Sequence, residues 1–243
     1  MITAINRFGL KRNIDAPIKR EIRQNCGFGC VICGLGIFEY EHVEPTWVNA
    51  KSHDPSNMTL LCVQCHGKKT RGMLSVETIQ KAMKNPKCKQ VGFSNEFFDL
   101  SDKMPLLIFG GTTFTNCRIP VRIGGEALFE ILPPEESGAL FRLNASIYDS
   151  KGDISLHIIE NEWRALNTNW DVEIVGPLIT IREKLGQINL VIRAMPPDGI
   201  AIERLQMTYA GVNITGNVES LTIDFLTITK GKVDNSEIGF DWE

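Results

Sequence analysis

The sequence contains no apolar segment of the roughly 20 residues that a membrane-spanning helix needs, so we expect no such helix. Its first residues, Met1 to Arg7, also lack the apolar core and the small-residue cleavage site of a secretory signal. These two absences predict a cytoplasmic protein that has no membrane partner.

The cysteines do not form the even set that a secreted disulfide scaffold requires, because there are seven of them. Four form two CxxC pairs, Cys30 with Cys33 and Cys62 with Cys65. This spacing is typical of two zinc knuckles that close one tetrahedral site, and metal-bound thiolates suit a reducing compartment. Such a Zn²⁺ is structural, since all four positions are filled, and it supplements the core of a small domain. The alternative, four buried free thiols, does not account for the paired spacing.

The charges are divided unevenly along the chain. Residues 1–90 hold 14 Lys and Arg against 7 Asp and Glu, a net charge of +7, while residues 91–243 hold 12 against 22, a net charge of −10. A basic N-terminal part suits a polyanionic substrate. The acidic part would repel that substrate, so we expect it to bind a protein partner or another copy of itself.

The sequence pattern changes near residue 105. From there on, short β-branched runs alternate with turn signals such as Gly124-Gly125 and residues 196–199. We predict a small zinc-stabilised domain with a basic N-terminal helix at 1–84, a polar linker at 85–104 and an acidic, mostly antiparallel all-β domain at 105–243. The fold class is then α+β, and the second domain is a sandwich or barrel. A short β-solenoid is the alternative, although no fixed-period repeat is evident. No catalytic motif is visible in the second domain.

Four residues around the cysteine pairs carry further chemistry. Glu41 and His42 end a stretch in which aromatic and acidic residues alternate as in a strand. Asn57 follows a turn, and His66 directly follows the last cysteine. Each residue alone has an ordinary interpretation: His42 as a hydrogen-bonded structural residue, Asn57 as a turn residue and His66 as an alternative zinc ligand. Their order between and after the CxxC pairs favours a shared function.

This order, CxxC, acid-His, Asn, then CxxC-His, resembles the HNH nuclease family with its ββα-metal fold, over roughly the N-terminal third of the chain. The resemblance implies a metal-dependent endonuclease in which His42 is the general base that takes a proton from the attacking water. It implies that Glu41 and His66 hold one divalent ion and that Asn57 orients His42 and braces the loop. This chain departs from the family in having Glu41 where Asp is commoner.

A cation at this position would stabilise the negative charge that gathers on the phosphate oxygens in the transition state. Mg²⁺ or Mn²⁺ is the expected ion for oxygen ligands, although a His ligand also admits Ni²⁺ or Zn²⁺. Alternation along the strand sends the side chains of Glu41 and His42 to opposite sides unless the strand end twists. His53, nearby in sequence, is a weaker candidate for substrate contact.

Basic residues precede and follow the motif. As phosphate contacts they would position nucleic acid without reading its sequence, whereas as ordinary surface they would only be solvated. These candidate nucleic-acid contacts are Lys19, Arg20, Arg23, Lys68, Lys69 and Arg71.

The sequence therefore predicts an HNH endonuclease that hydrolyses phosphodiester bonds of DNA, rather than RNA, and is regulated by its C-terminal β domain. A catalytically inactive zinc-containing protein that binds nucleic acid or acts as a scaffold is the alternative. Because bacterial antiviral systems often join HNH modules to sensing or assembling domains, we also hypothesise a role in phage defence, with a homo-oligomer or a protein partner as the trigger.

Overall fold

The structure is a computed structural model that describes residues 5–243, so the first four residues of the predicted N-terminal domain lie outside the described part. It divides into two compact units, residues 1–96 and 97–243. The division falls inside the predicted linker, which contains helix α4 (Lys87–Val91) and strand β3 (Phe93–Phe97). No helix among the described residues combines the length and the apolar character that crossing a bilayer requires.

Unit 1 is built around one helix, a two-stranded sheet and a second helix. Helix α1 ends where Gly27 adopts a left-handed backbone with φ 71°. Strands β1 and β2 pair antiparallel, with His42 opposite Met58, and α2 follows β2 directly. The bounds are α1 Ala16–Cys26, β1 Glu39–His42, η1 Trp47–Asn49, η2 Pro55–Asn57, β2 Met58–Leu61, α2 Val63–Thr70, α3 Val76–Lys84, α4 Lys87–Val91 and β3 Phe93–Phe97.

The core of unit 1 is small and includes the cysteine pairs. Ile22 from α1, Leu60 and Leu61 from β2, and Ile79 from α3 are fully buried in one cluster with Cys30. Since the two strands are only four residues long, their pairing alone could not hold this unit together. The strand–strand–helix order that the family resemblance implied is present, and it positions the candidate site.

Unit 2 consists of strands β4–β17. Most neighbours are antiparallel hairpins, whereas β4 pairs parallel with β13 and β5 pairs parallel with β17. The bounds are β4 Leu106–Phe109, β5 Thr112–Ile123, β6 Glu126–Leu132, β7 Arg142–Tyr148, β8 Ile154–Ile159, β9 Glu162–Leu166, β10 Asp171–Val175, β11 Leu178–Lys184, β12 Gln187–Met195, β13 Gly199–Tyr209, β14 Val212–Gly216, β15 Ser220–Ile223, β16 Leu226–Thr229 and β17 Lys232–Trp242.

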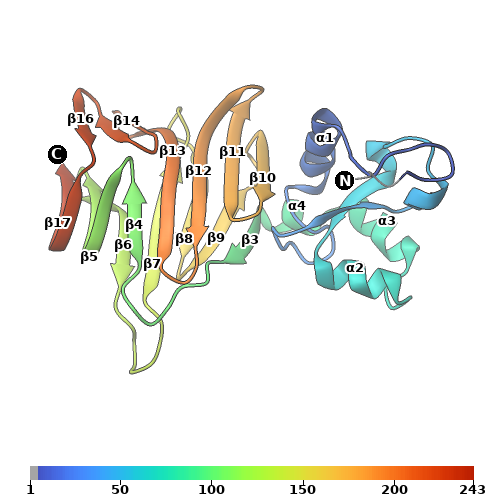
Figure 1. Ribbon diagram of the computed structural model, residues 1–243, viewed down its shortest axis with the longest axis horizontal. Helices are drawn as coiled ribbons and strands as arrows, with labels where there is room; N and C mark the ends of the chain where they lie inside the picture. The colour runs from blue at the N-terminus through green and yellow to red at the C-terminus, as the bar shows by residue number, and fades with distance from the viewer. Residues whose placement is uncertain (1–4) are drawn as a thin grey trace. The chain divides into compact units, whose positions relative to one another are not determined.

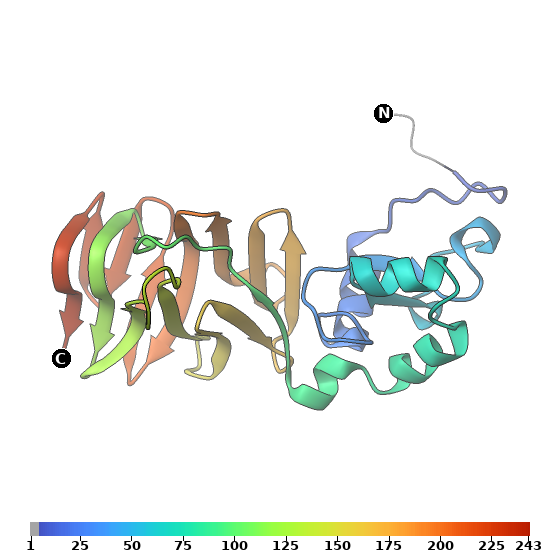
Figure 2. The ribbon, with the colours of Figure 1, turned by 90° about the horizontal axis from the view of Figure 1, so that it is seen from below.

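The sheet of unit 2 folds over on itself. Its strand order runs β10-β11-β12-β13-β4-β5-β6-β7-β8-β9, and Figures 1 and 2 show β10–β13 and β6–β9 in two facing layers. Alternate apolar side chains, such as Ile192 and Ile202 in one layer and Ile147 and Ile158 in the other, are buried. The predicted mostly antiparallel all-β architecture is confirmed. The described strands form no closed barrel, and their hairpin connections are not those of a solenoid.

Candidate active site

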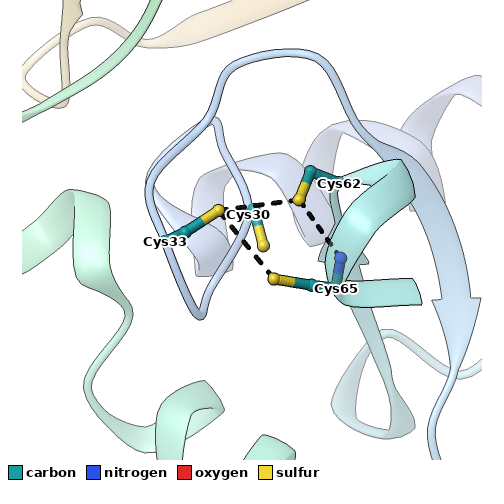
Figure 3. Close-up of side chains that lie close together, drawn as sticks. All are labelled: Cys30, Cys33, Cys62 and Cys65. Atoms are coloured by element: carbon teal, nitrogen blue, oxygen red, sulfur yellow. Dashed lines mark hydrogen bonds between the residues drawn. The ribbon is translucent and has the colours of Figure 1, made fainter. Parts of the chain in front are cut away.

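The four cysteines of the CxxC pairs converge on one point (Figure 3). Their sulfur atoms lie within 4.8 Å of one another, with 3.6 Å from Cys33 to Cys62 and 4.0 Å from Cys33 to Cys65. Four thiolates placed tetrahedrally about 2.3 Å from Zn²⁺ would lie about 3.8 Å apart. The arrangement therefore fits a zinc ion.

Backbone hydrogen bonds form the first knuckle. Gly34, at φ 89°, donates its N–H to the Cys30 carbonyl at 2.8 Å, and the Cys30 N–H donates to the Leu35 carbonyl at 2.8 Å. The N–H of Val31 donates to the Leu60 carbonyl at 3.1 Å, which joins the knuckle to β2. In the second knuckle, Cys62 is the N-cap of α2, so the first turn of that helix sets the position of Cys65.

The cluster cannot hold four negative charges by itself. A hydrogen bond from the Cys33 thiol lowers the pKa of Cys30 to about 5, and the shared hydrogen bond raises the pKa of Cys33. Burial raises the pKa of Cys65 to about 12. One thiolate is thus favoured beside neutral thiols until a cation offsets the repulsion, which is the role that Zn²⁺ would fill.

A second group of side chains connects α2 with β1. His66 on α2 lies between two glutamates of β1: its Nδ1 is 2.7 Å from Glu39 Oε2 and its Nε2 is 3.2 Å from Glu41 Oε2. Lys69 forms an ion pair with Glu41 and donates to the His42 carbonyl at 3.0 Å. Glu39 and Glu41 share one face of the strand because they are two residues apart. The structure therefore brings the two expected ligands, Glu41 and His66, together.

The ring of His42 lies elsewhere. It is only 7% exposed, and its Nε2 is 3.0 Å from Nδ1 of His53, whose Nε2 is 2.9 Å from the Lys11 carbonyl oxygen. Burial lowers the pKa of His42, and the charges of His53 and Lys69 lower it further, while Glu41 acts in the opposite direction. His42 and Glu41 thus have different side-chain partners, as the alternation of the strand predicted.

Asn57 contributes to the loop that faces His42. Its amide donates to Asp54 Oδ2 at 2.9 Å, and its carbonyl accepts from the Val43 N–H at 3.0 Å, next to His42. The ring of His42 is hydrogen-bonded to His53 instead of the Asn57 amide. His42 and Asn57 nevertheless line one cavity of about 280 Å³, which residues 45, 49–52 and 54 complete.

The six basic candidates differ in their surroundings. Arg23 is 3% exposed and donates to the Tyr40 hydroxyl at 2.7 Å, and Lys19 lies over the Tyr40 ring at 5.7 Å. Lys69 forms its ion pair with Glu41. Lys68 and Arg71 are exposed on or just after α2, while Arg20 is half-buried on α1.

Two residues of this site received little or no weight in the sequence analysis. Strand periodicity could have identified Glu39, since it lies two residues before Glu41 on a predicted strand and so shares its face. His53 was only a weak candidate because it lies in an irregular loop, where no periodicity predicts which residue it contacts.

Comparison with known proteins assigns a family to this part of the chain. Residues 24–72 match the model of the HNH endonuclease family. No curated protein and no solved structure gives a significant match to the chain. The matched segment begins near the end of α1 and includes both knuckles, β1, β2 and α2, and unit 2 lies outside it. Residues 24–72 are therefore similar to the HNH endonuclease family.

Proposed function

We propose that this protein is a metal-dependent endonuclease that hydrolyses phosphodiester bonds of DNA. The observation that carries the proposal is the contact of His66 with both Glu41 and Glu39. Two ligands at right angles, each about 2.1 Å from one octahedral ion, are about 3.0 Å apart. The observed 3.2 Å between His66 Nε2 and Glu41 Oε2 fits that separation.

Glu39 supports the same proposal from the other side of the imidazole ring. Its carboxylate, 2.7 Å from His66 Nδ1, would accept a hydrogen bond from that nitrogen and leave Nε2 free as a ligand. A divalent ion held by Glu41 and His66, Mg²⁺ or Mn²⁺, would supply positive charge for the transition state. The proposal requires the DNA phosphate to reach both this ion and the cavity that contains His42, which neither Glu41 nor His66 lines. Lys69 would then keep its hydrogen bond to the His42 carbonyl while sharing Glu41.

His42 is the general base in this proposal. A neutral imidazole accepts the proton of the attacking water, and burial favours the neutral ring near pH 7. Asn57 would brace the loop through Asp54 and so shape the cavity that it shares with His42. The exposed Lys68 and Arg71, together with the net positive charge of residues 1–90, would hold the phosphate backbone without reading base sequence.

We also propose that unit 2 regulates the nuclease in the cytoplasm through a homo-oligomer or a protein partner, as an effector of antiviral defence. Its support is the opposite charge of the two parts of the chain and the lack of any recognisable catalytic motif in unit 2. Light scattering of the full chain, with and without DNA, would test the assembly. A chain that stays monomeric and binds no protein would contradict this part of the proposal.

Cleavage should depend on a divalent ion and on its two ligands. We expect the wild type to cut supercoiled plasmid with Mg²⁺ or Mn²⁺ and to stop after EDTA treatment that leaves the structural zinc in place. Glu41→Ala and His66→Ala should each raise the Mn²⁺ concentration for half-maximal rate by at least about 10-fold, because each removes a ligand. His157→Ala, in unit 2, is the matched control. DNA binding without cleavage under any divalent ion would favour the inactive binding protein instead.

The rate should fall at low pH with a midpoint below 6.5, the ordinary value for histidine. Since burial lowers the pKa of His42, its ring stays neutral, and able to accept a proton, at pH values where an exposed histidine is already charged. Initial rates between pH 5 and 8 would give the acid limb of kcat/KM. A limb centred above 6.5 would show that another group controls the rate.

A further inference from the structure

We infer that His53 is a positioning residue that holds His42 with its Nε2 protonated and its Nδ1 as the nitrogen that accepts the proton of water. This inference rests on the proposed function for its catalytic meaning, but the arrangement of protons is a property of the protein itself. It also makes residues 5–14 part of the site, although they lie outside the segment that matches the HNH family.

The protons follow from the hydrogen-bond partners. A backbone carbonyl only accepts, so His53 Nε2, 2.9 Å from the Lys11 oxygen, must carry a hydrogen. When both rings are neutral, the single N–H of His53 is at Nε2, so its Nδ1 accepts and His42 Nε2, 3.0 Å away, donates. Nδ1 of His42 is then its unprotonated nitrogen. After the proton moves from water to Nδ1, the imidazolium keeps its Nε2–H on His53, and the hydroxide oxygen is free to attack phosphorus.

The Lys11 carbonyl is held in place by a tightly bonded turn. Asn6 is buried, and its amide nitrogen donates to the carbonyls of Trp47 and Ala50 at 2.6 and 2.7 Å. Its side-chain oxygen accepts from the N–H groups of Phe8 and Leu10, each at 2.9 Å. The side-chain amide of Asn6 thus donates two hydrogen bonds and accepts two, which is its full capacity.

The same turn is attached to the loop at a second point. The backbone of Ile5 forms a bridge with Lys11, and the guanidinium of Arg12 lies 4.2 Å from the centre of the Trp47 ring. Ala50, to which Asn6 donates, lines the cavity that contains His42. The N-terminal segment, the loop and His53 therefore form one hydrogen-bonded support for the base.

The direct test is the position of the protons. Long-range ¹H–¹⁵N correlation spectra distinguish protonated from unprotonated ring nitrogens, and only four histidines need assignment. In the wild type above the pKa of the ring, we expect the hydrogen of His42 on Nε2. In His53→Ala it should distribute between both nitrogens. A wild-type His42 with its hydrogen on Nδ1 would overturn the inference, whether or not the protein cleaves DNA.

Kinetics give the second test. His53→Ala should lower kcat about 100-fold through misplacement of the base, while KM and the Mn²⁺ dependence stay unchanged. His53→Gln should recover most of the rate, because a Gln side chain can also donate to Lys11 and accept from His42. Equal losses in both variants, with zinc content and melting temperature intact, would contradict the positioning role. Absence of cleavage in the wild type, with the expected proton arrangement, would count against the proposed function alone.

The contribution of the N-terminal segment can be tested separately in the full chain. Asn6→Asp places a carboxylate oxygen against two carbonyls and should reproduce the kinetic loss of His53→Ala. Asn13→Asp, an exposed position in the same segment, makes the same change of charge and should leave the rate unchanged. Equal rates for the two variants would show that the segment does not support His42.

Discussion

Replacement of His42 by alanine is expected to lower the rate of DNA cleavage by about 10²–10⁴-fold, the usual contribution of a general base. Two titratable groups near His42 are already engaged: His53 is hydrogen-bonded to the Lys11 carbonyl, and Asp54, which lines the same cavity, accepts hydrogen bonds from Ser56 and Asn57. Zinc content and DNA affinity should be unchanged, since His42 contacts neither the cysteine cluster nor the exposed basic residues. Single-turnover cleavage of plasmid would measure the loss.

The matched control for this variant is His157→Ala. That histidine is half-buried, whereas His42 is buried, and it hydrogen-bonds to Ser146 at 3.3 Å on β7 of the other unit. The His157→Ala variant should cleave at the wild-type rate. A His42→Ala protein that is folded, loaded with zinc and as active as this control would remove His42 from the mechanism.

The second large effect is expected from Cys62→Ser. Structural zinc contributes about 10–16 kcal/mol of apparent binding free energy in small zinc domains. That is comparable to the whole stability of a typical domain, about 5–15 kcal/mol. Loss of one of four thiolates should therefore abolish zinc binding and unfold unit 1, because its strands are short and its core is centred on the knuckles. Metal analysis and calorimetry would show the missing zinc and the missing transition.

Cys26→Ser provides the control for zinc loss. Cys26 is buried 3.5 Å from Thr59 Oγ1, and burial raises its pKa to about 11, so it stays a neutral thiol that does not compete for the metal. This variant should retain one zinc per chain and only lose some stability. If Cys26→Ser lost the ion, or Cys62→Ser kept it, the ligand set would have to be revised.

Local spacing made the zinc cluster and the strand–strand–helix segment predictable. A CxxC pair closes on itself within a few residues, and the capping of α2 by Cys62 follows from the residues beside it. The same holds for the hairpins of unit 2, where turn residues and alternation lie next to each other. The parallel pairings of β4 with β13 and of β5 with β17 join segments about a hundred residues apart, and no local signal specifies them.

The site was predictable only to the extent that it depends on neighbours in sequence. Glu41 and His66 were paired through the family resemblance, and strand alternation predicted that Glu41 and His42 would have different partners. The contact between His42 and His53 depends on how an irregular loop and the N-terminal turn pack together. Arg23 was assigned to phosphate from its charge, but the hydroxyl of Tyr40 and burial against β1 determine its surroundings.

The pairing of β17 with β5 also sets an order of events during translation. Unit 1 is formed by the first 96 residues. In unit 2, β5 can pair with β17 only after the chain has grown more than a hundred residues beyond β5. At about 5–20 residues per second, the ribosome needs about 7 to 30 seconds to add the residues after unit 1. Residues 24–72, which match the HNH family model, can therefore fold during that interval, before the acidic unit 2 is complete.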